Sequence, residues 1–278
     1  MPQIFSMNGE PGANGPKTSA VPSPVYGIQT LDCSEEEWQE RVDLAAAYRL
    51  LHKMKLNESI FNHLTAEIPG SNGGAFLVLP FGLMWNEVTA SNLLTVDVDG
   101  KVLRGDGIPE ETAFVIHSRI HTNRPNSRCV MHTHQPWATA LCCLEDPRLP
   151  MIHQQSQAFY NDIAYDPDYN GLVVECDEGD RLAQVMGDKH TLLHSNHGVI
   201  VAAESIARAF DYIYYLERAA NLAVTAMSTG KKLKLIRDTV AASFKQAFDS
   251  PGGLEYSKKS FEAYKRELMR QGDADFLT

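Results

Sequence analysis

The sequence predicts an α/β fold in which helices cover a mainly antiparallel sheet. Short apolar runs of strand type gather in the middle of the chain, and segments with helical spacing lie before and after them. An Asp-Gly pair at residues 99–100, between two β-rich runs, is a strong signal for an antiparallel hairpin. Strands and helices that segregate in this way pack as one sheet with helices on its faces. We therefore expect a single domain over residues 33–278, with a helical C-terminal extension.

Residues 1–32 are predicted to be a flexible arm. The segment contains "NGEPGANGPKTSAVPSP", which is rich in Gly, Pro, Asn and Ser and shows no apolar period. An arm of this composition can become ordered against a neighbouring subunit. The first helix should follow directly in "EEEWQERVDLAAAYRLLHKM", because Ser34 and Glu37 have the spacing of a capping box and Trp38, Val42 and Leu51 recur at helical spacing.

The next elements should be strands. The apolar runs "SIFNHLTAEI" and "AFLVLPFGLMW" are separated by "PGSNGG", which predicts a strand, a turn and a second strand. The hairpin in "NLLTVDVDGKVL" follows them. The segment "IPEETAFVIHSRIHTN" should be a helix, because its acidic residues lie in the first turn, where the helix dipole favours them.

In the second half of the chain, strands and helices should alternate before the sequence becomes helical throughout. We expect a strand at Arg128–His132, a helix from about Pro136 to Cys143 and another near Glu178–Met186. A pair of strands should surround "HTLLHSNHGVIVAA", and everything from Ser205 onward should be helical.

Composition narrows the possible partners. The chain has 278 residues, of which 44% are hydrophobic and 22% charged, and its formal net charge is -10. Without a basic surplus to neutralise phosphates, neither a nucleic acid nor an anionic membrane is an expected partner. No apolar run is long enough to span a bilayer, and no secretory signal is recognisable. The five cysteines form an odd set without C-x-x-C spacing, which favours reduced thiols and a cytoplasmic location.

The stretch "CVMHTHQPWATAL" contains the best candidates for chemistry. His132 and His134 are two residues apart, so on a strand both side chains point to the same face and can share one metal ion. The alternative is a pair of half-buried histidines bound to the backbone. A third ligand is needed, and the candidates are His117, His121, His194 and His197. The first two lie four residues apart on a helix, where packing or capping is the simpler interpretation, whereas the glycine after His197 permits a tight turn that presents the ring.

The motifs together resemble the class II aldolase/adducin family. The resemblance covers about residues 40–230 and rests on "FNHLTAEI", "FLVLPFGLMWNEVTASNLL", "IHSRIHTNRPNSRCVMHTHQPWATAL" and "LLHSNHGVIV", in that order. It implies a three-layer α/β/α class II aldolase-like fold with a mainly antiparallel central sheet, usually assembled as a homotetramer with active sites at the subunit interfaces. It also implies that His132, His134 and His197 bind a divalent metal (Zn, Mn or Fe(II)), with His194 as a neighbour. In the family this metal is a Lewis acid that acts on a substrate carbonyl and an adjacent oxygen.

The sequence departs from the sugar-phosphate aldolases of that family. The glutamate that serves them as acid/base maps to Ala113, whether counted from His132 or from His117. Glu111 could replace it only with a rearranged helix start, and its alternative role is that of a first-turn acid. The phosphate-binding serines map to Glu111 and Thr112, and the Thr-Gly of the phosphate loop maps to Phe81-Gly82.

Two further positions concern the substrate. Asn62 matches a family asparagine near the phosphate pocket, and a tyrosine that the aldolases take from a neighbouring subunit maps to Gln154, beside His153. A carboxylate and a phenylalanine in the phosphate pocket disfavour a phosphorylated substrate. A flatter or more apolar one fits Phe81, Trp85 and Trp137 better, although these aromatic residues could equally be core residues.

Three functions are compatible with this pattern. The favoured one is a metal-dependent lyase that cleaves a carbon–carbon bond of, or decarboxylates, a non-phosphorylated keto or hydroxy acid. Decarboxylation removes no hydroxyl proton and so tolerates the loss at Ala113. The second is a non-haem Fe(II) oxygenase that acts on an aromatic keto acid through the same three histidines. The third is a non-catalytic interaction module, because "PFGLMWNEVTASNLL" resembles the adducin head more closely than the aldolases.

Overall fold

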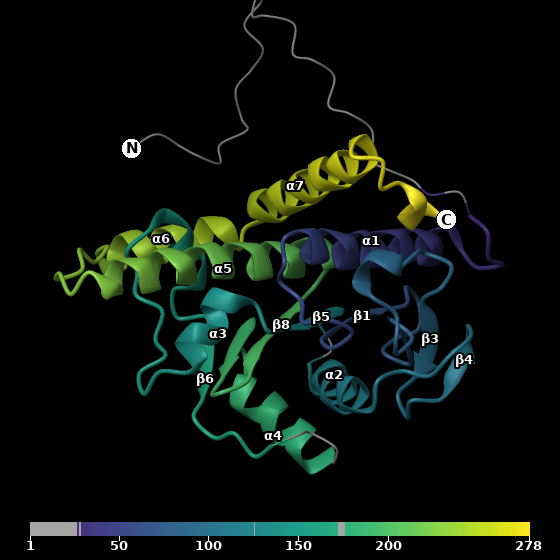
Figure 1. The fold of residues 1–278 in the computed structure, drawn as a ribbon, viewed down its shortest axis with the longest axis horizontal. Coiled ribbons are helices and arrows are strands. Elements are labelled where there is room, and N and C mark those ends of the chain that lie inside the picture. The colour runs from purple at the N-terminus through teal and green to yellow at the C-terminus, as the bar shows by residue number, and fades with distance from the viewer. Residues whose placement is uncertain (1–26, 28, 125, 172–175) are drawn as a thin grey trace, which may run out of the picture.

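The computed structural model describes residues 27, 29–124, 126–171 and 176–278, except for the side chains of residues 111–113 and 176. It contains one eight-stranded sheet with the order β4-β3-β2-β1-β5-β8-β7-β6 (Figure 1). Every neighbouring pair is antiparallel except β6 and β7. The strands are β1 His63–Glu67, β2 Ala75–Val78, β3 Leu94–Asp97, β4 Val102–Arg104, β5 Cys129–Thr133, β6 Ile163–Asp166, β7 Thr191–His194 and β8 Gly198–Ala203. The predicted sheet is confirmed; β6 is the strand that the sequence did not reveal.

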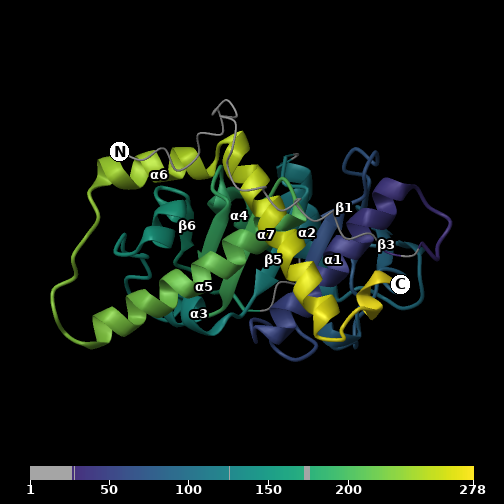
Figure 2. The ribbon, with the colours of Figure 1, turned by 90° about the horizontal axis from the view of Figure 1, so that it is seen from above.

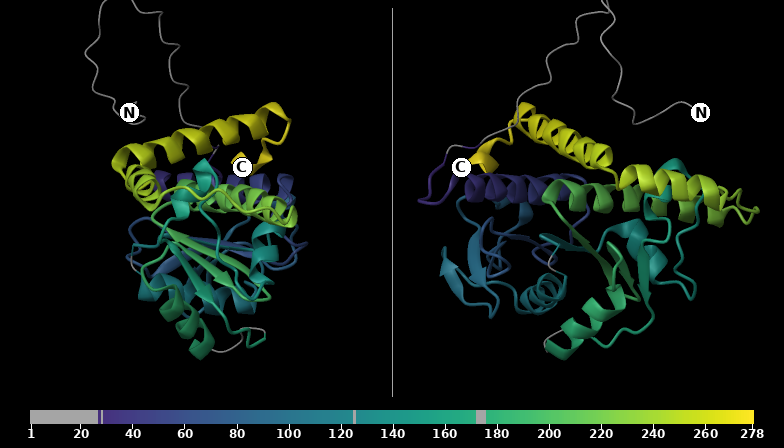
Figure 3. Two further views of the ribbon diagram at one scale, coloured as in Figure 1. Left: turned by 90° about the vertical axis from the view of Figure 1, so that its left-hand side faces the viewer. Right: turned by 180° about the vertical axis from the view of Figure 1, so that it is seen from behind.

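Helices cover both faces of this sheet, so the three-layer architecture is confirmed as well. On one face lie α1 (Glu35–Lys53), α3 (Pro136–Cys142), α5 (Ile206–Ser228) and α7 (Pro251–Arg270), which share the largest apolar core with the sheet. On the other face α2 (Glu111–Asn123) packs beside α4 (Cys176–Met186) over a smaller core (Figure 3).

The first helix begins where the sequence predicts. The Ser34 hydroxyl accepts a hydrogen bond from the Glu37 backbone N–H at 3.1 Å and so caps α1. Inside the core, the Tyr48 hydroxyl donates to the carbonyl of Leu64 at 2.7 Å and accepts from its N–H at 2.9 Å, which fastens α1 to β1. Gly100 closes the β3–β4 hairpin with φ +81°, as the Asp-Gly signal predicts.

The C-terminal third is mainly helical, and its longest interruption follows α5. Residues 229–237 form a loop between α5 and α6 (Asp238–Phe248), and Gly230 in that loop has φ +67°. Seen from above, α7 lies across α5 and α1 (Figure 2).

Little of the predicted N-terminal arm belongs to the described part. Leu31 packs against the large core, while residues 1–26 and 28 lie outside the described residues. None of the helices in the described part of the chain combines the length and apolar character that a membrane crossing requires.

Candidate metal centre

Three histidines from separate places in the chain meet at one end of the sheet. His132 lies near the end of β5, His134 follows just beyond it, and His197 lies in the turn between β7 and β8. The ring centroids of each pair are 4.9 Å apart. One nitrogen of each ring lies within 4.8 Å of the others. The fold thus brings together the set that the sequence singled out.

Gly198 was expected to permit a tight turn, but the structure requires a glycine here for lack of space. A Cβ at this position would lie 2.7 Å from the His134 ring and 2.7 Å from the Thr133 carbonyl oxygen, so that a side chain would collide with both. The left-handed residue of the turn is Asn196, with φ +54°. The glycine therefore allows β8 to approach His134 closely.

Hydrogen bonds fix the tautomers of two of these rings. His132 Nδ1 lies 2.9 Å from the Val199 carbonyl oxygen, which can only accept, so the proton is on Nδ1. His134 Nδ1 lies 2.7 Å from the Glu58 carboxylate, which accepts in the same way. In the neutral form of both rings, the two Nε2 lone pairs face each other across 3.1 Å.

This arrangement suits a shared divalent cation. Two lone pairs at that distance repel, whereas two nitrogens bound tetrahedrally to one zinc at about 2.0–2.1 Å lie roughly 3.3 Å apart. Burial, together with the neighbouring histidines, holds the pKa of His132 well below its usual range. Burial, His134 and His194 lower the pKa of His197 to about 4. Both imidazoles are thus neutral at pH 7, as metal ligands must be.

Glu58 and Asn62 support His134. The Asn62 side-chain oxygen accepts from the backbone N–H groups of His134 at 3.1 Å and Glu58 at 3.0 Å. Asn62 is buried, holds φ +69°, and its Nδ2 has no partner among the described residues. Asn62, which was expected to bind substrate, therefore also holds the backbone of His134 and Glu58 in place. Glu58 was missed because nothing in the sequence links it to His134.

A second carboxylate lies behind His197. His194 Nδ1 is 2.8 Å from the carboxylate of Asp166, which Arg181 also contacts at 2.7 Å. The ring centroids of His194 and His197 are 5.0 Å apart, and His194 Nδ1 lies close to Asp166 without the geometry of a hydrogen bond. The ring of Tyr169, which is 47% exposed, has its centroid 5.7 Å from that of His197. This aromatic neighbour was not predicted.

The two histidines on α2 lie inside the fold and not in the metal centre. His117 and His121 are both buried, and both hydrogen-bond to the hydroxyl of Thr65. Neither belongs to the metal-ligand cluster found in the described part of the chain.

Of the predicted acid/base and phosphate-pocket positions, the structure describes the side chain of Phe81 but not those at the start of α2. Glu111, Thr112 and Ala113 form the first turn of α2, and their side chains lie outside the described part. Phe81 is 45% exposed, and Gly82 after it has φ +101°.

Of the other two aromatic residues considered for the substrate, one belongs to the core. Trp85 is fully buried and packs edge-on against Tyr48 with a centroid distance of 4.8 Å, so the idea that it faces a substrate is wrong. Trp137 is 37% exposed.

His153 and Gln154 lie apart from the three histidines within one chain. His153 Nδ1 accepts from the Gln155 N–H at 3.3 Å in its own turn. Gln154 lines a cavity of about 510 Å³ against α5, α6 and α7, and none of the three histidines lines it.

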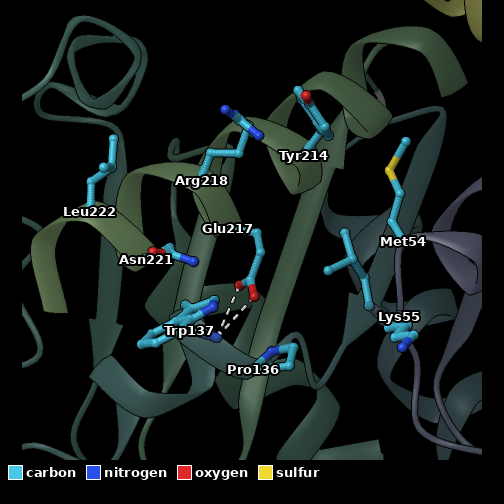
Figure 4. A pocket seen from close by; sticks show the side chains of 10 residues that line it. Met54, Lys55, Pro136, Trp137, Tyr214, Glu217, Arg218, Asn221 and Leu222 are labelled. Carbon is cyan, nitrogen blue, oxygen red and sulfur yellow. Dashed lines mark hydrogen bonds between the residues drawn. The ribbon is translucent and has the colours of Figure 1, made fainter. Parts of the chain in front are cut away.

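The helix after His134 has an unusual anchor. Glu217 on α5 points toward the start of α3, where its carboxylate accepts from the N–H of Trp137 at 2.9 Å (Figure 4). It also accepts from the N–H of Ala138 at 3.0 Å. Glu217 and Trp137 border a cavity of about 500 Å³ that Met54 and Leu222 also line. Burial raises the pKa of Glu217, and the two N–H donors oppose this effect.

Comparison with known proteins gives a consistent result. The profile of the family described as "Class II Aldolase and Adducin N-terminal domain" matches residues 42–224. An adducin-related protein of Schizosaccharomyces pombe is 35% identical over 264 residues, and the match covers 88% of this chain and 78% of that protein. The crystal structure of an aldolase II superfamily protein from Pseudomonas syringae has a TM-score of 0.81 at 33% identity, covering 89% of this chain and 98% of that one. An L-fuculose 1-phosphate aldolase from Glaciozyma antarctica has a TM-score of 0.74 at 25% identity, covering 87% and 95%.

Proposed function

This chain belongs to the class II aldolase and adducin family, and from that premise we propose that it is a divalent-metal-dependent lyase. Its substrate would be a non-phosphorylated, aromatic or otherwise apolar, keto or hydroxy acid. The reaction would be carbon–carbon cleavage or decarboxylation. The observation that carries the proposal is the convergence of His132, His134 and His197, with the Nε2 lone pairs of the first two facing each other at 3.1 Å.

The chain's own groups define what the site can do. The Val199 carbonyl and the Glu58 carboxylate keep Nε2 of two ligands free of protons. The unpartnered Nδ2 of Asn62 can donate to a substrate oxygen. A divalent metal bound here would supply Lewis-acid polarisation of a carbonyl. In a decarboxylation the bond to the carboxylate carbon breaks, CO₂ leaves, the electron pair stays on the remaining carbon, and that carbon then takes a proton from solvent.

Charge near the centre argues against a sugar phosphate. Among the described residues, the charged side chains that contact His132, His134, His194 or His197 are the carboxylates of Glu58 and Asp166. Arg181 is already held by Asp166 and Glu178 at 2.7 Å each. A phosphate would find repulsion here, whereas Tyr169 beside His197 offers an aromatic surface.

The assembly is part of the proposal. We propose a homotetramer with its sites at the subunit interfaces. Gln154 and His153 would then reach a site of a neighbouring subunit, because within one chain Gln154 lines a different cavity. Sedimentation equilibrium measures the oligomeric state directly, and a monomer would contradict this arrangement.

Elemental analysis of anaerobically purified protein tests the function. We expect about one divalent metal per subunit, and its loss in His132→Ala and His197→Ala. His52→Ala on α1 is a matched control outside the centre and should keep the metal. Full metal occupancy in the double variant His132→Ala/His197→Ala would refute the site.

The identity of the metal and the product separate the alternatives. Zinc or manganese with CO₂ release or carbon–carbon cleavage would select the lyase. Iron with O₂ consumption on aromatic keto acids would select the oxygenase. A protein without metal affinity would select the non-catalytic module, which the similarity to the adducin-related protein favours.

A further inference from the structure

A fourth imidazole, that of His63, borders the metal centre. His63 on β1 is the cross-strand partner of His132 on β5, so both side chains point to the α2 face of the sheet. Their ring centroids are 4.9 Å apart, and His63 is only 6% exposed. The role proposed for this residue rests on the proposed function, because its ligand would be one that is bound to the metal.

His63 is the first member of a buried hydrogen-bonded chain. Its Nδ1 lies 2.8 Å from His117 Nε2, and His117 Nδ1 lies 2.7 Å from the Thr65 hydroxyl oxygen. That hydroxyl lies 2.8 Å from His121 Nε2, and His121 Nδ1 lies 2.7 Å from the Ser127 carbonyl oxygen. We call these residues the histidine chain.

The carbonyl at the far end decides every proton position in the histidine chain. Because the Ser127 carbonyl can only accept, His121 carries its proton on Nδ1 and must accept at Nε2 from Thr65. The single hydroxyl proton of Thr65 is then used, so Thr65 accepts from His117 Nδ1–H. His117 therefore accepts at Nε2 from His63 Nδ1–H, and Nε2 of His63 is left with a lone pair.

This derivation requires neutral rings, and their surroundings favour them. His63, His117 and His121 are all buried, and among the described residues no carboxylate pairs with any of them to hold a second proton. Burial also lowers the pKa of His121 to about 4. Burial, with the two neighbouring histidines, holds the pKa of His117 well below its usual range. The opposite direction would point an unprotonated His121 nitrogen at a carbonyl oxygen, which is repulsive.

The histidine chain orients His63 but does not conduct protons. A proton entering at His63 could pass along the rings only if the far end released one, and a backbone carbonyl has none to release. His63 Nε2 is therefore a fixed acceptor, and it has no hydrogen-bond partner among the described residues. It lies on the edge of the ring away from Nδ1, which is directed to α2.

We propose that Nε2 of His63 accepts a hydrogen bond from a hydroxyl group of the metal-bound substrate. The substrate is then a hydroxy acid, and the site discriminates against compounds in which that oxygen carries no proton. His63 would contact the substrate directly, whereas Thr65 and His117 act as positioning residues. Nε2 of His63 is not among the fully buried polar atoms that lack a partner in the described part of the chain, so solvent reaches it and a ligand hydroxyl can take the place of water there.

Two small probes test the acceptor. Glycolate and methoxyacetate offer a metal the same two oxygens, but only glycolate has a hydroxyl proton. We measure their binding to the Co²⁺-loaded protein by its visible absorption. One hydrogen bond should make the glycolate preference roughly three- to tenfold larger in the wild type than in His63→Phe. Equal preferences in the two proteins would overturn the proposal.

Thr65→Val tests the positioning without touching the ligand. It removes the group that fixes the proton of His117, so His63 can take the other tautomer and the glycolate preference should fall toward that of His63→Phe. Thr191→Val is the matched control, because this buried threonine of the same sheet has a hydroxyl without a partner. It should keep the wild-type preference.

The ¹⁵N shifts of labelled histidines give a readout that is independent of any activity. We expect Nδ1–H tautomers at His63, His117 and His121 in the wild type, and an altered ratio at the first two in Thr65→Val. An Nε2–H tautomer at His63 in the wild type would overturn the proposal even if metal is bound. A protein that takes up no Co²⁺ would instead refute the proposed function and, with it, the ligand contact.

Discussion

Replacing Glu58 by alanine is expected to weaken divalent-metal binding about tenfold. The Glu58 carboxylate lies 2.7 Å from His134 Nδ1 and so keeps the proton on that nitrogen and Nε2 free for the metal. Losing it removes both an acceptor that orients the ring and a negative charge that makes the imidazole a better donor.

The exposure of the pair sets the magnitude. Carboxylates that support a ligating histidine typically contribute 10–100-fold to metal affinity. The Glu58 side chain is 65% exposed and that of His134 is 23% exposed, so water screens their interaction. We therefore expect the lower end of this range, a tenfold loss of metal affinity, which corresponds to about 1.4 kcal/mol of binding free energy.

Competition with a chromophoric chelator measures the zinc affinity. Glu58→Gln keeps a carbonyl acceptor and loses only the charge, so its affinity should lie between those of the wild type and Glu58→Ala. Glu255→Gln on α7 makes the same charge change at an exposed residue paired with Lys259, and it should bind zinc as the wild type does. A zinc affinity of Glu58→Ala within twofold of the wild type would refute this role.

Two further predictions concern stability, and urea unfolding measures both. Burial, followed by the nearby charge of Asp43, raises the pKa of Glu40 to about 7. Its stabilising contribution is thus complete below the unfolded pKa of about 4.5 and is lost as the pH rises through 7, so Glu40→Gln should increase the free energy of unfolding at pH 8 by about 1–3 kcal/mol. An unchanged pH dependence between pH 5 and 8 would contradict it. Glu217→Ala leaves the N–H groups of Trp137 and Ala138 without their acceptor and should cost about 1–3 kcal/mol, whereas Glu217→Gln should cost less; equal stability of all three proteins would show that the anchor is dispensable.

Local signals in the sequence predicted most of the elements. The capping residue Ser34, the Asp-Gly turn and the two-residue spacing of His132 and His134 act over a few residues, and each is found where it was expected. Strand β6 was missed because its partner β7 is parallel and lies beyond α4 in the chain. Parallel pairing needs a long crossover connection, so no turn motif announces it.

By itself, the sequence determined the fold class, the family and the three histidines that could share a metal. The tertiary structure alone decided which groups surround them. Glu58 is 76 residues from His134 in the sequence, and His63 is 54 residues from His117. Hydrophobic periodicity and helix capping are short-range consequences of backbone geometry. The contacts of Glu58 with His134 and of His63 with His117 form only when distant strands and helices pack together. The same packing directs the protons of the histidine chain, because a carbonyl beyond the end of α2 sets the tautomer of a ring beside the metal centre.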